Sequence, residues 1–129
     1  MSDAEPVTFA LQEFLGMSMT DSPDGAVARI DLDERHQNPN GVAHGAVLFA
    51  MVDTAMGKAT MEVVDEGCFC ASIEVQLRFL RPGGTGVHEA VARVVKAGRS
   101  VVHLEAKLTG PDGRLVATAT GTFAVIRPA

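Results

Sequence analysis

The sequence predicts an α+β fold in which one long helix lies against an antiparallel sheet. A run of apolar and small side chains within residues 36–60 is long enough for a helix of several turns and carries few charges. Residues 68–81 alternate between apolar and polar side chains with a period of two, as a strand does. Two short turn signals, at residues 97–99 and 111–114, join further strands and make them antiparallel neighbours.

The remaining elements follow from the same patterns. Residues 7–17 have apolar side chains at helical spacing, which predicts a short amphipathic helix that covers an edge or the mouth of a pocket. Residues 25–33 follow a Ser-Pro-Asp-Gly turn and alternate as a strand. Residues 87–96, 101–109 and 115–126 are three more strands. Together with residues 68–81 they are expected to form a four-strand meander.

Composition limits the classes of function. The chain has 129 residues, 47% of them hydrophobic and 21% charged, which fits a single domain spanning residues 1–129. Its net charge of −5 and the absence of a Lys/Arg cluster argue against nucleic-acid binding. No basic segment followed by an apolar run opens the sequence, and two charges interrupt the apolar helix, so neither a signal peptide nor a membrane span is expected. Cys68 and Cys70 lie too close for an easy disulfide, which suggests a reducing, cytoplasmic location.

Asp53 is the first candidate for chemistry. From Val42 to Met61 the ionisable side chains are His44, Asp53 and Lys58. A carboxylate in an otherwise apolar helix is costly unless a backbone group, an arginine or a substrate uses it. Small neighbours leave room for a substrate, and burial raises the pKa of a carboxylate, as a useful general base requires. Apolar residues on both sides of the helix predict that it is buried nearly all round.

Gly45, at the expected start of this helix, is the second candidate. Free backbone N–H groups and about half a positive charge gather at a helix start, and glycine lets a ligand approach closely. Gly45 precedes Asp53 by eight residues, roughly 12 Å along the axis, and His44 is about half a turn out of phase with Asp53. One helix therefore cannot bring both groups to one carbonyl. We predict a homodimer with composite active sites.

Three other chemistries lack support. The four histidines and two cysteines have no metal-ligand spacing, so neither a metal nor a cofactor is expected. Residues 83–86 are glycine-rich but lack the ending of a phosphate-binding loop. No Gly-x-Ser-x-Gly elbow is present.

A known pattern covers the same residues. Asn38-Pro-Asn-Gly-Val-Ala-His44-Gly45-Ala46, followed by Asp53, resembles the signature of hotdog-fold acyl-CoA thioesterases, in particular the phenylacetate-pathway (PaaI-type) branch, to which thioesterase superfamily member 2 is similar. Residues 72–82, 94–101 and 121–125 resemble later strands of the family, so the resemblance covers nearly the whole chain. It implies the hotdog fold, in which an antiparallel sheet wraps one long central helix.

The resemblance also implies roles for residues. Asp53 is the general base or nucleophile, and the Gly45 N–H of the neighbouring chain polarises the thioester oxygen. Asn38 positions the carbonyl or water, His44 lies where the thiolate leaves, and Ser72 holds the water near the acid. The implied activity is hydrolysis of acyl-CoA by a dimer, usually paired into a tetramer. Thiolates leave easily, so one carboxylate suffices without a strong acid.

The substrate is less well defined. Ala46 stands where the family usually has a second glycine and is expected to narrow the acyl pocket. Phe49 and Met56 are expected to line that pocket, for either an aryl or a medium-chain acyl group. Coenzyme A phosphates need cations, for which the candidates are Arg81, Lys96 and the Gly98–Arg99 turn, although each is equally well explained as solvated surface.

Two other functions remain open. One is a non-catalytic hotdog module that binds acyl-CoA as a sensor, although binding alone does not need a water-directing acid. The other is a hotdog dehydratase, which usually presents a His/Asp or His/Glu pair in a different loop.

Overall fold

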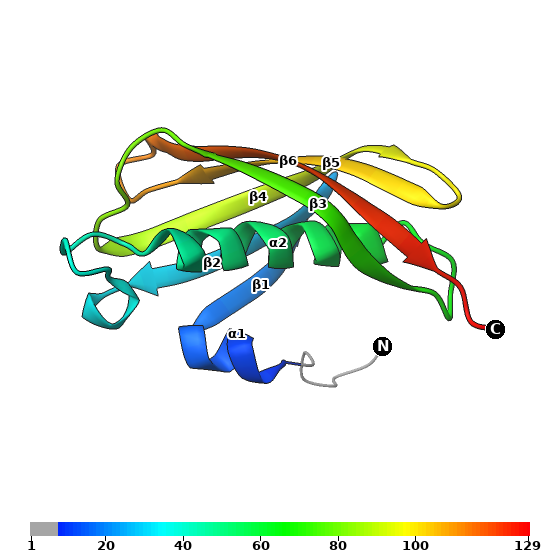
Figure 1. Cartoon of the computed structure of the whole chain (residues 1–129), viewed down its shortest axis with the longest axis horizontal. Helices are drawn as coiled ribbons and strands as arrows, with labels where there is room; N and C mark the ends of the chain where they lie inside the picture. Colours follow the sequence, from blue (N-terminus) through cyan, green and yellow to red (C-terminus); the bar gives the residue numbers. More distant parts are fainter. Residues whose placement is uncertain (1–7) are drawn as a thin grey trace.

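A computed structural model describes residues 8–129 as one six-stranded antiparallel sheet that curves around a long helix (Figure 1). The helices are α1 (Ala10–Leu15) and α2 (Gly45–Met61), with a 3-10 turn at Glu34–His36. The strands are β1 (Met17–Ser22), β2 (Gly25–Leu32), β3 (Phe69–Phe79), β4 (Gly86–Ala97), β5 (Val101–Thr109) and β6 (Leu115–Ile126). The predicted α+β hotdog fold, with a central helix wrapped by antiparallel strands, is confirmed.

The first helix is shorter than predicted, and a strand follows it. Of the predicted helix 7–17, the first residue lies outside the described part of the chain. The helix ends at Leu15 because Gly16 takes up a left-handed conformation (φ 69°), which only glycine adopts easily. Residues 17–22 then form β1, which pairs with β2 from Met17 opposite Ile30 to Ser22 opposite Gly25. The polar sequence of β1 gave no strand signal, because its stability comes from pairing with β2.

The predicted four-strand meander is wrong in one connection. The strand order is β1-β2-β4-β5-β6-β3, so β3 pairs with β6 at an edge of the sheet and does not touch β4 as a neighbour. The Pro-Gly-Gly segment after β3 is a crossover rather than a hairpin turn. The Gly83 carbonyl accepts a hydrogen bond from the Ala43 N–H (2.9 Å), and a Cβ on Gly83 would lie 3.1 Å from the Ala43 Cβ, a contact tighter than side chains usually make. The β4–β5 and β5–β6 hairpins are as predicted.

A β-bulge interrupts the alternation of β3. Ser72 lies opposite Phe123 and Glu74 lies opposite Thr122, so one extra residue stands in β3 at this point. Strict alternation had placed Ser72 on the same side as Glu74. Because of the bulge, Ser72 instead lies on the inner side of the sheet, with the half-buried Val75 and Leu77.

The core lies between α2 and the inner side of the sheet, chiefly β2 and β4. The buried side chains of α2 are Leu48, Met51, Val52, Ala55, Met56, Ala59 and Thr60. The expectation that α2 is buried nearly all round is wrong for a single chain, because Ala46 and Phe49 are exposed and Asp53 is half-buried. Within residues 8–129, one face of α2 is thus not packed against the sheet. Over residues 8–129, no helix combines the length and apolarity needed to cross a bilayer.

Candidate active site

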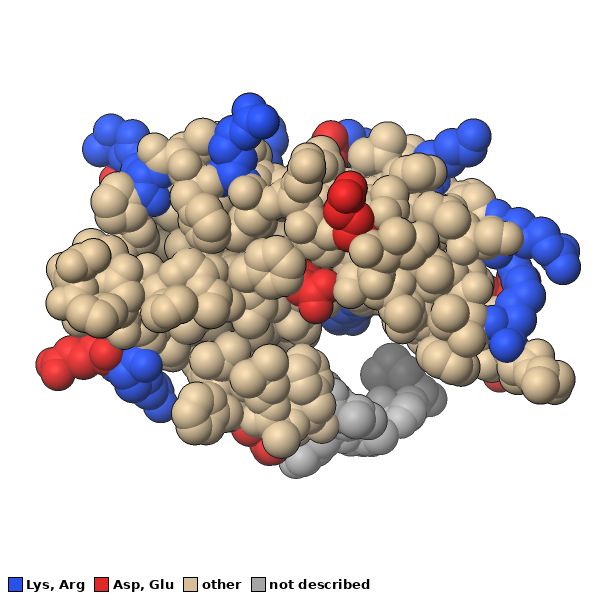
Figure 2. Space-filling view, in the orientation of Figure 1, with Lys and Arg blue, Asp and Glu red and all other residues tan. Residues whose placement is uncertain are grey.

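The uncovered face of α2 borders an open cavity of about 1330 Å³. Its walls come from α1, β1, α2 and the start of β3, with Phe123 of β6 behind them. The space-filling view, in the orientation of Figure 1, shows the side chains of α1 as a lobe below the body of the molecule (Figure 2). Among the predicted catalytic residues, Asp53 and Ser72 both line this cavity. The fold thus brings together an acid from a helix and a hydroxyl from an edge strand 19 positions later (72 − 53 = 19).

Asp53 is the unusual group in the cavity. Its Oδ1 is buried, and no described residue offers it a hydrogen bond. Burial raises the pKa of the Asp53 carboxyl above its ordinary value. Lys58, five positions along the same helix, does not compensate the charge because its ammonium binds Asp21 on β1 (2.7 Å) and Glu62 (2.9 Å). The cavity therefore holds an unpaired carboxylate that favours a proton, a water or a ligand as its partner.

Two polar groups of β3 lie beside this acid. Ser72 is exposed to the cavity and retains its hydroxyl for a water molecule. The Cys70 thiol donates a weak hydrogen bond to the Gly57 carbonyl (3.8 Å), one turn after Asp53. Burial, and then the charge of Asp53, raise the pKa of the Cys70 thiol, which keeps it protonated and a poor nucleophile. Of these three groups, the carboxylate is the one suited to activate water.

The start of α2 forms a second polar region, away from the cavity. His44 caps the helix by accepting the Ala46 N–H on its Nδ1 (2.9 Å). The N–H of Gly45 meets no acceptor within residues 8–129. The Phe79 ring lies next to it, since a Cβ on Gly45 would be 3.2 Å from the Phe79 Cζ. A free N–H at a helix start, reached past a residue with no side chain, is suited to a carbonyl oxygen.

The loop before α2 places Asn38 close to the same helix start. The Asn38 side-chain oxygen accepts the Asn40 N–H (2.8 Å), and its main chain bonds Val42 and Gly41, so the loop closes on itself. This arrangement leaves the amide Nδ2 of Asn38 without an acceptor among the described residues. Asn38, His44 and Gly45 do not line the Asp53 cavity. Within one chain, the structure forms two polar regions that are separated along α2.

The predicted substrate residues are divided in the same way. Ala46 and Phe49 are exposed on the first turns of α2 and lie outside the Asp53 cavity. Met56 is fully buried, with Gly121 leaving the space for its sulfur, so it belongs to the core. Arg81 follows β3, whereas Lys96, Gly98 and Arg99 are at the β4–β5 turn, at the opposite end of the sheet (Figure 1).

Several residues that line the cavity were not predicted from the sequence. Residues of α1 and directly before it are Thr8, Phe9, Leu11 and Gln12, and β1 adds Met17 and Met19. The end of α2 and the start of β3 add Met61, Phe69 and Cys70. No local pattern marks them, because they come near Asp53 through the pairing of β1 with β2 and the contact of α1 with β1. The amphipathic pattern of residues 7–17 predicted that this segment covers an edge or the mouth of a pocket, and α1 contributes Leu11 and Gln12 to the cavity lining.

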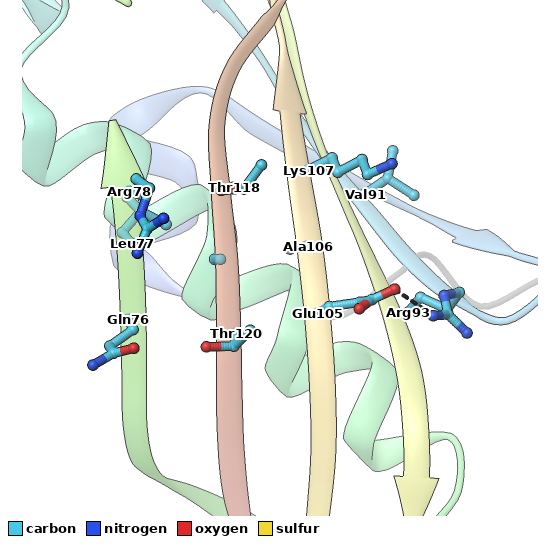
Figure 3. A pocket seen from close by; sticks show the side chains of 11 residues that line it. Gln76, Leu77, Arg78, Val91, Arg93, Glu105, Ala106, Lys107, Thr118 and Thr120 are labelled. Carbon is cyan, nitrogen blue, oxygen red and sulfur yellow. Dashed lines mark hydrogen bonds and ion pairs between the residues drawn. The ribbon is translucent and has the colours of Figure 1, made fainter. Parts of the chain in front are cut away.

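A second hollow, of about 980 Å³, lies on the outer side of the sheet (Figure 3). Side chains of β3, β4, β5 and β6 line it, among them Gln76, Arg78, Lys107 and Thr120. Two of its charged groups, Arg93 and Glu105, form an ion pair with each other. It contains none of the residues predicted to act in catalysis.

Comparison with known proteins identifies the family. The sequence model of the thioesterase superfamily matches residues 40–117, more than half of the chain, and the chain belongs to this superfamily. It is a thioester hydrolase by family, as the resemblance implied. The match does not assign it to the phenylacetate-pathway branch, which stays a prediction.

Relatives and solved structures agree with this family. The chain is 24% identical over 116 residues to a 1,4-dihydroxy-2-naphthoyl-CoA hydrolase of Listeria monocytogenes, covering 89% of this chain and 94% of that protein. A thioesterase of Haemophilus influenzae has a similar structure (TM-score 0.87, 24% identity, 92% of this chain and 83% of that chain). So has a Bacillus halodurans protein solved with CoA (TM-score 0.85, 24% identity, 93% and 78%).

Proposed function

We propose that this protein hydrolyses acyl-CoA thioesters with aryl or medium-chain acyl groups, releasing the free acid and coenzyme A. The observation that carries the proposal is the buried Oδ1 of Asp53, which lies in an open cavity and has no hydrogen-bond partner within residues 8–129. A relative that hydrolyses a naphthoyl-CoA and a structural neighbour that binds CoA support this ligand class. A sensor that only binds acyl-CoA has no use for an uncompensated acid at this point.

In the proposed reaction, Asp53 directs water, or its own carboxylate oxygen, at the thioester carbon. The Gly45 N–H of a neighbouring subunit stabilises the negative charge that develops on the thioester oxygen. Ser72 holds the water beside Asp53, and Asn38 orients the carbonyl or the water. The thiolate leaves on the side of His44 and takes up a proton.

The neighbouring subunit follows from distance. Gly45 and Asp53 are separated by roughly 12 Å along α2, so one chain cannot offer both to one carbonyl. The edge strand β3 exposes the apolar side chains of Phe69, Ile73 and Phe79 and has no strand on its outer side. An apolar edge of this kind is suited to pairing with a second copy. We therefore infer a homodimer through β3, paired further into a tetramer, with coenzyme A held by cations of both chains.

Mixing two inactive variants tests the composite site. Asp53→Asn removes the base, and Gly45→Pro removes the N–H at the first helical position, where proline is tolerated. His44 has the extended conformation that a following proline requires (ψ 133°). If each site combines Asp53 of one chain with Gly45 of the other, mixed dimers contain one intact site in two.

The readout is thiol release from a panel of acyl-CoAs, followed with a thiol-reactive dye. Random re-association of the two variants is expected to restore about one quarter of wild-type turnover. Recovery of no activity from dimers shown to be mixed would contradict the composite site. Tight acyl-CoA binding by the wild type without thiol release would favour the sensor instead.

A further inference from the structure

We propose that Leu11 on α1 determines which acyl groups the cavity accepts, and that His36 is the positioning residue that holds α1 in place. The proposal rests on the proposed thioester hydrolysis and names the part of the same site that selects the acyl chain. It assigns a role to α1 and to a buried histidine that the reaction itself does not use.

The N-terminal part of the chain lines one side of the cavity with both polar and apolar side chains, and the apolar ones come from α1 and β1. Phe9 and Leu11 line the cavity although about half of each side chain is exposed (45% and 52%). Met17 and Met19 continue this side of the cavity along β1. Methionine side chains adapt to many shapes, whereas a branched leucine on a helix has a defined shape. An acyl chain that extends away from Asp53 thus meets α1, and Leu11 limits how far it reaches.

The position of α1 depends on an anchor outside the helix. Six residues are too few for a stable isolated helix, and the N-cap residue Phe9 has no side-chain cap. At its other end, the Leu15 carbonyl accepts a hydrogen bond from the His36 Nε2 (2.9 Å). The His36 ring is fully buried, and its Nδ1 accepts the Asp33 N–H (3.0 Å), which leaves the proton on Nε2. The ring therefore joins the end of α1 to the 3-10 turn at residues 34–36.

The same residue also reaches the start of α2. The His36 carbonyl accepts the His44 N–H (2.8 Å), directly before Gly45. His36 thus holds α1 through Nε2 and the loop of the proposed oxyanion donor through its turn and its main chain. The two hydrogen bonds of the His36 ring, to Leu15 and to Asp33, can be removed separately by substitution.

Leu11 and Phe14 provide a matched pair of variants. Both are exposed apolar residues of α1, but Leu11 lines the cavity and Phe14 (78% exposed) does not. Leu11→Ala removes three carbon atoms from a side chain that is about half exposed, so it removes about half of the contact that a fully buried leucine would make with an acyl chain. We expect kcat/KM for the preferred acyl-CoA to fall roughly tenfold and the optimum to move to longer chains by about two carbons. Phe14→Ala is expected to keep the wild-type chain-length profile, and equal profiles for the two variants would overturn the proposal.

Two substitutions of His36 separate its two bonds. His36→Asn keeps an acceptor where Nδ1 lies and loses the bond to Leu15, whereas His36→Gln keeps a donor where Nε2 lies and loses the bond to Asp33. We expect His36→Asn to raise KM and to flatten the chain-length dependence, with kcat for a short acyl-CoA retained within about twofold. His36→Gln is expected to keep the chain-length dependence and to lose kcat. A general loss of stability would change both variants alike, and equal selectivity in the two would contradict the positioning role.

Binding without turnover keeps this test apart from that of the proposed function. S-alkyl-CoA thioethers of increasing chain length cannot be hydrolysed, and isothermal titration calorimetry gives their affinities for the wild type, Leu11→Ala and Phe14→Ala. If the wild type releases no thiol but Leu11→Ala shifts the preferred thioether length, the result contradicts the proposed hydrolysis and supports the role of Leu11 in acyl selection. If the wild type hydrolyses acyl-CoA but Leu11→Ala changes neither the turnover nor the binding profile, the result contradicts the role of Leu11 and supports the proposed hydrolysis.

Discussion

The two hollows of the molecule differ in how their charges are satisfied. On the outer side of the sheet, Arg93 and Glu105 bind each other in solvent. On the inner side, the Asp53 carboxylate is partly removed from water and has no partner among the described residues, while the one nearby cation, Lys58, is held by two other carboxylates. A paired charge at the surface gains little from a further partner because water already solvates it. A buried charge without a partner gains more free energy when a proton, a water molecule or a ligand binds to it. The buried carboxylate without a partner among the described residues therefore distinguishes the candidate active site from the hollow on the outer side.

The largest expected effect comes from the unpaired acid. Asp53→Asn keeps the shape of the side chain but cannot accept a proton, so turnover of acyl-CoA is expected to fall by about 10²–10⁴-fold. Thiol release measures the loss, and gel filtration with circular dichroism checks that the fold and the oligomer are retained. Turnover within threefold of the wild type would remove Asp53 from the mechanism.

A slightly smaller loss of turnover is expected when the free N–H at the start of α2 is removed. Gly45→Pro removes the free N–H without a helical hydrogen bond being lost, and loss of one oxyanion donor costs about 10²–10³ in kcat. The proline ring also enters the space next to Phe79, which is half-exposed and can move. Gly45→Ala is the control, because it places a Cβ in the same position but keeps the N–H. Equal losses for the two variants would assign the effect to bulk rather than to the donor.

Ser72→Ala tests the water-holding hydroxyl and is expected to lower kcat about fivefold, since one neutral hydrogen bond contributes about 1 kcal/mol. KM is expected to change little, because the hydroxyl contacts water rather than the acyl group. Thr120, which lines the outer groove, gives a matched control in Thr120→Ala. The same loss of kcat in both variants would mean that the effect does not depend on the position of the hydroxyl beside Asp53.

The charge of Asp53 also makes stability depend on pH. Its pKa is raised in the folded state, so the folded protein binds this proton more tightly than the unfolded chain does, and stability falls as the pH rises through the raised pKa. Asp53→Asn removes this cost and is expected to raise the Tm by roughly 2–4 °C at pH 7, with the difference disappearing below pH 3.8, the ordinary pKa of aspartate. Activity has the opposite dependence, since kcat/KM is expected to fall as the pH drops through the same raised pKa. A destabilised Asp53→Asn at pH 7 would contradict the unpaired carboxylate.

The same contrast explains what could be predicted from the sequence. Hydrophobic periodicity and turn chemistry predicted α2 and the hairpins of β4, β5 and β6, because local pattern and final structure agree there. The pairing of β3 with β6 and the existence of β1 depend on long-range contacts that leave no local trace. Asp53 was predicted as a candidate because a charge in an apolar run is locally conspicuous. Leu11 and His36 were not, since an exposed leucine and a buried histidine become notable only once the cavity is formed.

The smallest expected effect is on the outer side of the sheet, where both partners of an ion pair are about half-exposed (51% and 47%). Exposed pairs of this kind contribute little because water and salt solvate the separated charges nearly as well. Arg93→Ala and Glu105→Ala are therefore expected to leave the Tm and the acyl-CoA kinetics unchanged within error, as thermal unfolding and thiol release would record. A loss of turnover in either variant would show that the hollow on the outer side of the sheet takes part in the reaction. The contrast between paired and unpaired charges would then no longer distinguish the two hollows.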